Sequence, residues 1–424
     1  MGHETASHAR DEGRDRLARK AGDTTVHDNA ASIDMPRMRA YRLGRLQDQL
    51  KRQDYGAALL FDSVNIRYAS GTTNAQIFNF HTPSRCLFVP AEGLCVLFDQ
   101  EGWAGPALKL GTVGEIRTMP TFAHFYAGPR GADQAERLAV QIADLMAQHA
   151  GRNRRLAIDR IEATAIAALQ SKGLALVDGQ VSIERARSIK SPEEIACILA
   201  SITVAETAIA EMREALRPGM TENELFSILH QVNIANGGEW CEYRLLASGG
   251  RTNPWGQEAS DRVIRAGELV AFDTGMVGPY GYATDMSRTI FCHPGTPSAE
   301  QRRLYGIAHE NLHCNLALIR PGMSFREFTE KAWVIPDEFV KNRYPTPAHG
   351  IGMTDEYPMI AHLHDWEERG YDGTIEPGMT LSVESYIGSE RGAEGVKLEE
   401  QILVTDSGIQ RLSTFPYEDE LMPR

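Results

Sequence analysis

A weak internal repeat in the second half of the chain constrains the possible fold more than any other feature of the sequence. The segment Arg217–Glu224 reads Arg-Pro-Gly-Met-Thr-Glu-Asn-Glu, and residues 320–327 read Arg-Pro-Gly-Met-Ser-Phe-Arg-Glu. In each copy a Pro-Gly turn precedes a Thr or Ser with a Glu three residues later, which is the capping box of a helix start. The pattern predicts two equivalent helices, capped at Thr221 and Ser324.

A second pair of matching segments follows in the same order. Residues 264–270 lead into a strand that ends at Asp273, and residues 375–381 lead into a strand that ends at Glu384. In both cases a glycine stands six residues before the carboxylate. Chance can produce either short match, but two matches in the same order favour a duplicated helix-plus-strand half. Two such halves would bring their acidic strands to a shared centre.

Four carboxylates stand inside apolar, β-rich segments of these halves: Asp273, Asp285, Glu384 and Glu399. Taken singly, an acidic residue at a strand end is more often a turn or surface residue. The alternation of Lys397, Glu399 and Gln401 also fits a solvated strand face. A buried carboxylate, however, costs several kcal/mol unless it is paired or binds a cation. Four of them together predict a common positive counter-charge.

One histidine completes this set of candidate ligands. His349, within Ala-His-Gly-Ile-Gly, is by itself compatible with a hydrogen-bonded turn histidine. Together with the four carboxylates it forms a mainly hard ligand set, which suits two manganese, iron, cobalt or zinc ions bridged by a carboxylate. The sequence therefore predicts a dinuclear metal centre.

The chain as a whole is predicted to comprise three regions. Residues 1–34 are polar and charged without an apolar run, which indicates a flexible arm. Residues 35–184 alternate helical and strand-like segments, including an amphipathic helix over 38–53, and form an α/β domain without clustered His, Asp and Glu. A capped helix start follows at Ser191, within Ser-Pro-Glu-Glu, so the boundary lies near residues 180 to 190 and the second domain comprises residues 185–424.

The composition excludes several classes of partner. The chain carries 44 Lys and Arg against 57 Asp and Glu, a net charge of -13, so no basic surface is expected for nucleic acid. No stretch approaches the roughly 18 to 20 apolar residues of a membrane helix, so no membrane is expected as a partner. The six cysteines are scattered without a Cys-x-x-Cys pair, which argues against disulfides and favours a reducing cytoplasm.

The acidic strands and the histidine resemble the ligand set of the creatinase and methionine aminopeptidase superfamily. The likeness rests on the spacing from Asp273 to Asp285, the His-Gly-Ile-Gly motif, Pro-Gly-Met before Glu384, and Leu-Glu-Glu-Gln at Glu399. The segment 187–194 also resembles the one that joins the two domains of that superfamily. The resemblance implies a mixed α/β (α+β) chain, in which a creatinase-like N-terminal domain precedes a pseudo-symmetric pita-bread catalytic domain.

The same resemblance implies the cofactor and the assembly. It implies two divalent transition-metal ions, iron first, with manganese, cobalt or zinc as alternatives. It also implies a homodimer, because the N-terminal domain of relatives joins two subunits. The implied metal ligands are Asp273, Asp285, His349, Glu384 and Glu399.

Two positions depart from the peptidases of this superfamily. Where those enzymes place histidines that serve amide hydrolysis, this chain has Trp255 and Asp355. These residues, together with the segments 237–240 and 244–249, resemble the dimethylsulfoniopropionate lyase branch. The resemblance implies a small-molecule substrate that is cleaved to dimethyl sulfide and acrylate by β-elimination.

The lyase resemblance also implies roles for individual residues. Asp355 and Tyr344 are the implied catalytic residues, Asp355 as general base and Tyr344 over the substrate. The rings of Trp255, Tyr344 and Trp240 could face a sulfonium cation, with core packing as the alternative for all three and for Trp240 above all. Gly275 departs from the lyases, which have an aspartate there, and matches the hydrolases. A metal-dependent hydrolase of a small carboxylate, an amide or an Xaa-Pro peptide therefore stays open.

Overall fold

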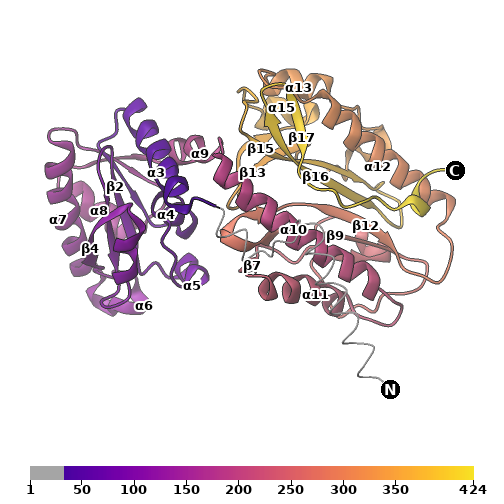
Figure 1. Ribbon diagram of the computed structural model, residues 1–424, viewed down its shortest axis with the longest axis horizontal. Helices are drawn as coiled ribbons and strands as arrows, with labels where there is room; N and C mark the ends of the chain where they lie inside the picture. The colour runs from indigo at the N-terminus through magenta and orange to yellow at the C-terminus, as the bar shows by residue number, and fades with distance from the viewer. Residues whose placement is uncertain (1–32) are drawn as a thin grey trace. The chain divides into compact units, whose positions relative to one another are not determined.

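The computed structural model describes residues 33–424, which form an N-terminal unit, Asp34–Arg187, and a C-terminal unit that follows it (Figure 1). The predicted flexible arm, residues 1–34, lies outside the described residues except for its last two. The predicted domain boundary, between residues 184 and 185, falls inside α9 (Gln180–Arg187), the last helix of the N-terminal unit.

The N-terminal unit is a six-stranded mixed sheet with helices packed on it, as predicted for an α/β domain. Its strands are β1 (Ala57–Leu60), β2 (Cys86–Pro90), β3 (Cys95–Asp99), β4 (Val113–Thr118), β5 (Arg155–Ile158) and β6 (Ala175–Asp178). Besides α9, its α-helices are α3 (Met35–Arg52), α4 (Ser63–Ser70), α5 (Gln76–His81), α6 (His124–Ala127), α7 (Gly131–Ala150) and α8 (Ala163–Ser171). The strand order is β4-β3-β2-β1-β5-β6.

The first helix of this unit begins three residues earlier than the sequence predicts. It begins at Met35 because the Asp34 side chain accepts a backbone hydrogen bond from the first turn and so caps the helix. The predicted apolar face is confirmed, since Leu43, Leu46 and Leu50 are buried. The strand-like segments predicted for this region are also confirmed, and the apolar strands β1 and β3 are two of them.

The C-terminal unit combines one five-stranded sheet with two three-stranded sheets. Its strands are β7 (Trp240–Cys241), β8 (Leu246–Ser248), β9 (Leu269–Asp273), β10 (Met276–Val277), β11 (Ala283–Thr284), β12 (Ser287–Phe291), β13 (Ala348–Ile351), β14 (Asp355–Ile360), β15 (Thr380–Ile387), β16 (Val396–Thr405) and β17 (Gly408–Arg411). Its α-helices are α10 (Pro192–Ala215), α11 (Glu222–Ala235), α12 (Ala299–Leu318), α13 (Phe325–Lys331), α14 (Asp337–Val340) and α15 (Trp366–Arg369). The strand orders are β14-β13-β15-β16-β17, β12-β9-β8 and β11-β10-β7.

The internal repeat is visible in the backbone of this unit. Gly219 N donates to the Ile264 carbonyl at 3.0 Å, and Ile264 N donates to the Met220 carbonyl at 2.8 Å. The same pair of bonds, at 2.8 Å each, recurs in the second copy among Gly322, Met323 and Ile375. Each copy thus ties the turn before a helix, α11 or α13, to the segment that leads into an acidic strand, β9 or β15. This is the arrangement expected of a duplicated half.

The helix caps of the two copies differ in one respect. The predicted capping box at Thr221 forms completely. Ser324 accepts a hydrogen bond from Glu327 N at 3.0 Å, but the Glu327 carboxylate pairs with Arg320 and Lys331. The predicted box at Ser324 is therefore only half formed, because two cations compete for the carboxylate that would close it.

Helix α10 corrects an expectation drawn from the sequence. Its predicted capping box at Ser191 is confirmed. By length and composition this helix is apolar enough to cross a membrane, although no such stretch was expected in the chain. Most of its apolar window is buried inside the unit, where the helix contacts α11. A buried position of this kind is that of a core helix.

Candidate metal centre

Two of the predicted ligands lie on the strand pair β15 and β16. These strands are antiparallel, and their register places Glu384 directly opposite Glu399. Both side chains are buried. Like charges directly opposite each other destabilise a strand pair, so this arrangement requires a cation beside them.

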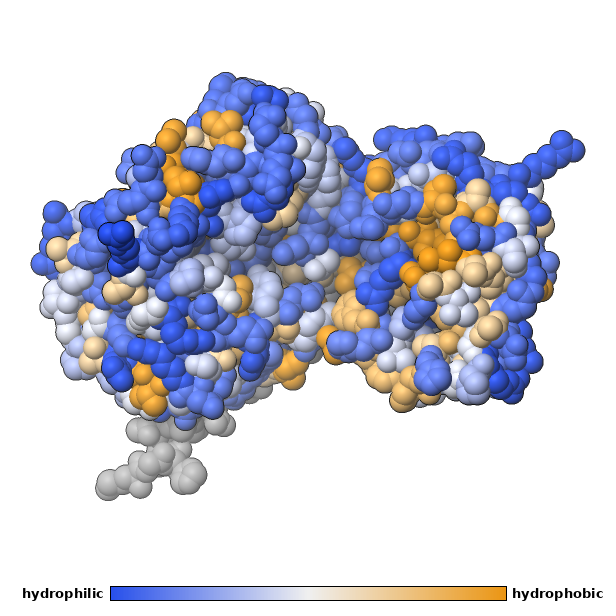
Figure 2. Space-filling model, turned by 180° about the vertical axis from the view of Figure 1, so that it is seen from behind, coloured by the Kyte–Doolittle hydropathy of each residue, from blue (hydrophilic) through white to orange (hydrophobic). Residues whose placement is uncertain are grey.

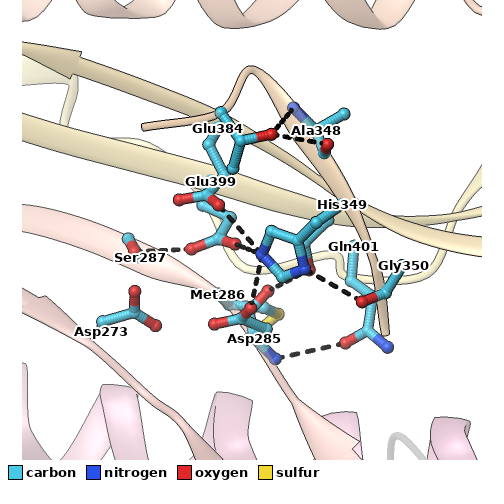
Figure 3. A network of polar contacts seen from close by, with 12 residues as sticks. Asp273, Asp285, Met286, Ser287, Ala348, His349, Gly350, Glu384, Glu399 and Gln401 are labelled. Atoms are coloured by element: carbon cyan, nitrogen blue, oxygen red, sulfur yellow. Dashed lines mark hydrogen bonds and ion pairs between the residues drawn. The ribbon is translucent and has the colours of Figure 1, made fainter. Parts of the chain in front are cut away.

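The other two predicted carboxylates come from the first half of the repeat. Asp273 is the last residue of β9 and lies opposite Ser287 of β12, while Asp285 stands just before β12. Both aspartates are buried. The Ser287 hydroxyl donates a hydrogen bond to Glu399 Oε2 at 2.7 Å and so links the two halves. Figure 3 shows the acidic side chains of both halves around one centre.

His349 directs its ring towards these carboxylates from a bulge in β13. Its Nδ1 lies 2.9 Å from the Gly350 carbonyl, and donation there directs Nε2 towards the carboxylates, where a metal ion would replace the Nε2 proton. Nε2 lies 3.1 Å from Asp285 Oδ2, 2.9 Å from Glu384 Oε1 and 3.9 Å from Glu399 Oε1 (Figure 3). Three carboxylates and one imidazole therefore converge on one point, named here the first metal position.

This first metal position fits a transition-metal ion. One ligand atom each from Asp285, His349 and Glu399 lie within 4.8 Å of one another. Glu384 Oε1 and Glu399 Oε1 are buried and form no hydrogen bond within the described part of the chain. Buried carboxylate oxygens without a donor need a cation. The ligand set of one nitrogen and several oxygens suits a divalent transition metal.

The pKa values of the carboxyl groups in the centre also indicate that positive charge is needed there. Burial and the charge of Asp285 raise the pKa of Asp273 and of Glu399 well above the usual range. Burial is the largest single influence on Asp285 and acts in the same direction, but the hydrogen bond and charge of His349, together with Asp273 and Lys397, outweigh it and lower the pKa of Asp285. The carboxylates therefore share too little positive charge from the protein alone to ionise freely.

Lys397 is a residue of this centre whose role the sequence did not indicate. Its ammonium lies 2.7 Å from Glu384 Oε2, 2.9 Å from Glu399 Oε2 and 3.7 Å from Asp273 Oδ2. The alternative interpretation of this strand face as solvated is wrong, because Lys397, Glu399 and Gln401 are all fully buried. The period of two that places Lys397 beside Glu399 was the only sequence signal for it.

Tyr243 is the second group that sequence reasoning missed. Its hydroxyl donates to Asp285 Oδ1 at 2.7 Å and lies 3.4 Å from Asp273 Oδ1. Its ring lies against Gly275, where an added Cβ would stand 2.4 to 2.7 Å from three ring carbons. Tyr243 thus fills the space of a side chain at position 275. Its place directly before the segment 244–249 was the one signal available.

Asp355 is the first residue of β14 and keeps an exposed surface beside the buried ligands. The protein around its carboxyl group and the charge of Asp285 raise the pKa of Asp355 to about 7. Water at its open surface and bound metal ions both stabilise the carboxylate, so they lower the pKa from this value. A carboxyl group with a pKa near neutrality is suited to accept a proton from a substrate.

Tyr344 and Trp255 lie beside the centre, with their rings around Lys397. The ring centroids are 4.6 Å and 5.8 Å from the ammonium, which is the range of cation–π contacts. The cation that both rings face here is a side chain, and their contact with a substrate stays a prediction. The Trp255 indole Nε1 is buried without a hydrogen-bond partner among the described residues, which leaves a donor for another group. Trp240, in β7, is half-buried.

The fold and the centre define a pita-bread metalloenzyme with a creatinase-type N-terminal domain. Residues 196–406 match metallopeptidase family M24, and residues 42–189 match the creatinase/prolidase N-terminal domain. The chain belongs to this family, which confirms the resemblance recognised from its motifs. Its fold is similar to that of the Xaa-Pro dipeptidase from Bacillus anthracis, with a TM-score of 0.71 and 22% identity over 90% of this chain and 99% of that chain.

Within this family, the chain is similar in sequence to lyases as well as to peptidases. The chain is 36% identical over 396 residues to the dimethylsulfoniopropionate lyase DddP of Roseovarius nubinhibens, which is 92% of this chain and 89% of that protein. The enzyme of the same name from Roseobacter denitrificans is also 36% identical, over 93% of this chain and 90% of its own length. The Xaa-Pro dipeptidase of Pyrococcus furiosus is 30% identical over 236 residues, 54% of this chain and 64% of that protein.

Proposed function

We propose that this protein is a metal-dependent lyase that cleaves dimethylsulfoniopropionate to dimethyl sulfide and acrylate by β-elimination. The observation that carries the proposal is Asp355. Beside the metal centre, where the peptidases place a histidine, the chain presents an accessible carboxylate whose pKa the surrounding protein raises. The likeness to two DddP lyases over 92% and 93% of the chain supports the same reaction.

In the β-elimination, each residue around the centre would have its own role. Asp355 takes the proton from the carbon next to the substrate carboxylate, and the electron pair of that C–H bond forms the new double bond. The C–S bond breaks, and its electron pair leaves with sulfur as neutral dimethyl sulfide. A metal ion held by Asp285, His349, Glu384 and Glu399 would supply positive charge for the substrate carboxylate and for the charge developing on it. Tyr344 and Trp255 border the space beside the centre.

Membership of family M24 implies divalent metal ions. We propose iron as the resident metal, with manganese, cobalt or zinc as alternatives. The ligand chemistry supports this choice, because one imidazole with several carboxylates suits these ions better than thiolate-seeking metals. Metal analysis of the protein as purified tests the identity of the ion.

Substrate cleavage distinguishes the lyase from a hydrolase. Iron-loaded protein incubated with dimethylsulfoniopropionate should release dimethyl sulfide and acrylate in equal amounts, measured by gas and liquid chromatography. Xaa-Pro dipeptides, incubated separately, should release no free amino acids, because Trp255 and Asp355 replace the histidines that serve amide hydrolysis. Free amino acids without dimethyl sulfide would instead favour a metal-dependent hydrolase, the alternative with which Gly275 agrees.

We also propose a homodimer assembled through the N-terminal unit. Aromatic side chains stay exposed there: Phe125 is 73% exposed and Phe78 is 43% exposed, with ring centroids 6.2 Å apart. Figure 2 shows apolar surface gathered on one face of this unit. Contiguous apolar surface of this kind marks interaction sites, and a second copy of the chain is the partner proposed here.

Light scattering tests this assembly. The protein should have twice the 46.9 kDa mass of one chain across a wide concentration range. Phe125→Glu should shift the mass towards that of one chain, because an interface must then desolvate a charge. Val334→Glu, at an 80% exposed apolar residue of the C-terminal unit, should leave the mass unchanged. A single-chain mass for the unchanged protein contradicts the proposal.

We propose a cytoplasmic location, which the six free cysteines support because they suit a reducing compartment. Cell fractionation followed by detection of the protein tests this location, and recovery outside the cytoplasm contradicts it.

A further inference from the structure

The sequence predicts two metal positions, and in this structure they differ in whether protein groups already contact the oxygens that a metal ion would use. At the first position, Glu384 Oε1 and Glu399 Oε1 face His349 without a hydrogen-bond donor. Two ions of a dinuclear centre stand about 3.5 to 4 Å apart and share bridging carboxylates. Figure 3 shows Asp285 and Glu399 between His349 and Asp273, and Asp285 Oδ2 and Glu399 Oε1 are the oxygens nearest His349 Nε2. A second ion would therefore use the far oxygens, Asp285 Oδ1 and Glu399 Oε2.

Protein donors already contact both of these far oxygens. Glu399 Oε2 accepts hydrogen bonds from the Ser287 hydroxyl at 2.7 Å and from the Lys397 ammonium at 2.9 Å. Asp285 Oδ1 accepts a hydrogen bond from the Tyr243 hydroxyl at 2.7 Å. A second ion would have to displace these donors before it could share the two carboxylates.

Lys397 has the surroundings of a bound cation. Its ammonium is fully buried and contacts Glu384 Oε2 at 2.7 Å and the Ser287 hydroxyl at 2.8 Å, besides Glu399. Asp273, the carboxylate left for a second ion, lies 3.7 Å from the same ammonium. A buried charge is costly unless opposite charges and hydrogen bonds surround it, and this one has three carboxylates around it. The lysine therefore supplies positive charge where a second ion would.

The ring of Tyr243 prevents position 275 from supplying a further ligand. A Cβ at Gly275 would stand 2.4 to 2.7 Å from carbons of that ring, and the backbone there has a φ of +43° that strains any L side chain. The second position consequently has Asp273 as its one unshared carboxylate among the described residues.

We propose that the Lys397 ammonium is the resident cation of the second position, so that each chain binds one metal ion tightly, at the first position. Lys397 is then a positioning residue. It holds Glu384 and Glu399 by their far oxygens, and the near oxygens face the metal together with His349. This inference concerns the metal centre alone and does not depend on which substrate the enzyme cleaves.

A manganese titration of the unchanged protein tests the proposal without any variant. The full chain is stripped of metal with a chelator, and Mn²⁺ is added while its electron paramagnetic resonance spectrum is recorded. The first equivalent should give the six-line spectrum of an isolated ion. Since groups beside metal ligands typically change metal affinity by about 10- to 100-fold, the second ion should bind at least about 10-fold more weakly. Two ions of equal affinity with an exchange-coupled spectrum overturn the proposal.

Substitutions at position 397 test the role of the lysine. Lys397→Met keeps the length of the side chain but removes its charge, so the variant should bind a second Mn²⁺ and show a coupled spectrum. Lys397→Arg keeps the charge and should bind one ion. Lys190→Met removes another buried lysine, paired with Glu356, and serves as the control that should also bind one ion.

The result for Lys397→Met decides whether the lysine takes the place of a second metal ion. A folded Lys397→Met protein that still binds one ion contradicts the role of Lys397. If this variant does not fold, the titration of the unchanged protein alone decides between one and two tight ions. Because neither measurement uses a substrate, failure of the lyase assay would leave both results interpretable.

Discussion

Asp355→Asn should lower kcat by about 10²- to 10⁴-fold, the usual contribution of a general base, with KM little changed. The amide keeps the size of the side chain but cannot accept the proton of the substrate. The ligands around His349 are not altered, so the metal content should equal that of the unchanged protein. Steady-state release of dimethyl sulfide measures the rate, and inductively coupled plasma mass spectrometry measures the metal.

The same residue should control the acid side of the pH profile. The protein around the carboxyl group and the charge of Asp285 raise the pKa of Asp355 to about 7, and bound metal ions lower it from there. Because the base acts only when deprotonated, kcat/KM should fall as the pH decreases through a pKa at or below about 7. Asp355→Asn should lose this dependence, whereas Asp337→Asn, at an exposed carboxylate of α14, should retain both rate and profile.

Two other outcomes at Asp355 would change its assignment. Near-normal turnover of Asp355→Asn would remove the carboxylate from the mechanism and favour hydrolysis by a metal-activated water. Loss of metal from the variant would make Asp355 a ligand or a support of one. The metal analysis and the rate therefore have to be measured on the same samples.

Asp285→Ala or Glu399→Ala should abolish both tight metal binding and activity. Each residue supplies an oxygen to the group that converges with His349 within 4.8 Å, and each is buried. Removing either carboxylate leaves too few ligands to hold a divalent ion in this position. Metal content and dimethyl sulfide release should both fall to background. Full activity in a rigorously metal-free sample would contradict the predicted centre.

Glu400→Gln is the matched control for Glu399→Ala. Glu400 follows Glu399 on β16, but it pairs with Arg288 and Arg411 and accepts a hydrogen bond from Tyr417. Breaking a buried ion pair costs about 3–5 kcal/mol, so the melting temperature should fall. Metal content per folded chain should stay unchanged. Equal metal loss in both variants would assign the effect of Glu399→Ala to destabilisation rather than to a lost ligand.

Local patterns in the sequence were sufficient for several helix starts, for the duplicated halves and for the acidic part of the centre, whereas the pita-bread architecture was inferred from the family resemblance. The capping boxes at Ser191 and Thr221 depend on residues three apart, so they could be predicted and are observed. The repeated turn and strand segments indicated that Asp273 and Glu384 occupy equivalent places. Because carboxylates on buried strands need a counter-charge wherever they occur, the requirement for a cation also follows from sequence alone.

The neighbours of those carboxylates follow from contacts between distant segments. Alternation along β16 places Lys397 on the face of Glu399, but burial of that face depends on β12, whose Thr289 hydroxyl donates to the Lys397 carbonyl at 2.9 Å across 108 residues of sequence. The contact of Tyr243 with Gly275 likewise joins the connection between β7 and β8 to the turn between β9 and β10. A period of two assigns side chains to faces, whereas the packing of other elements determines what covers each face. The cation beside Glu399 is for this reason a property of the tertiary structure.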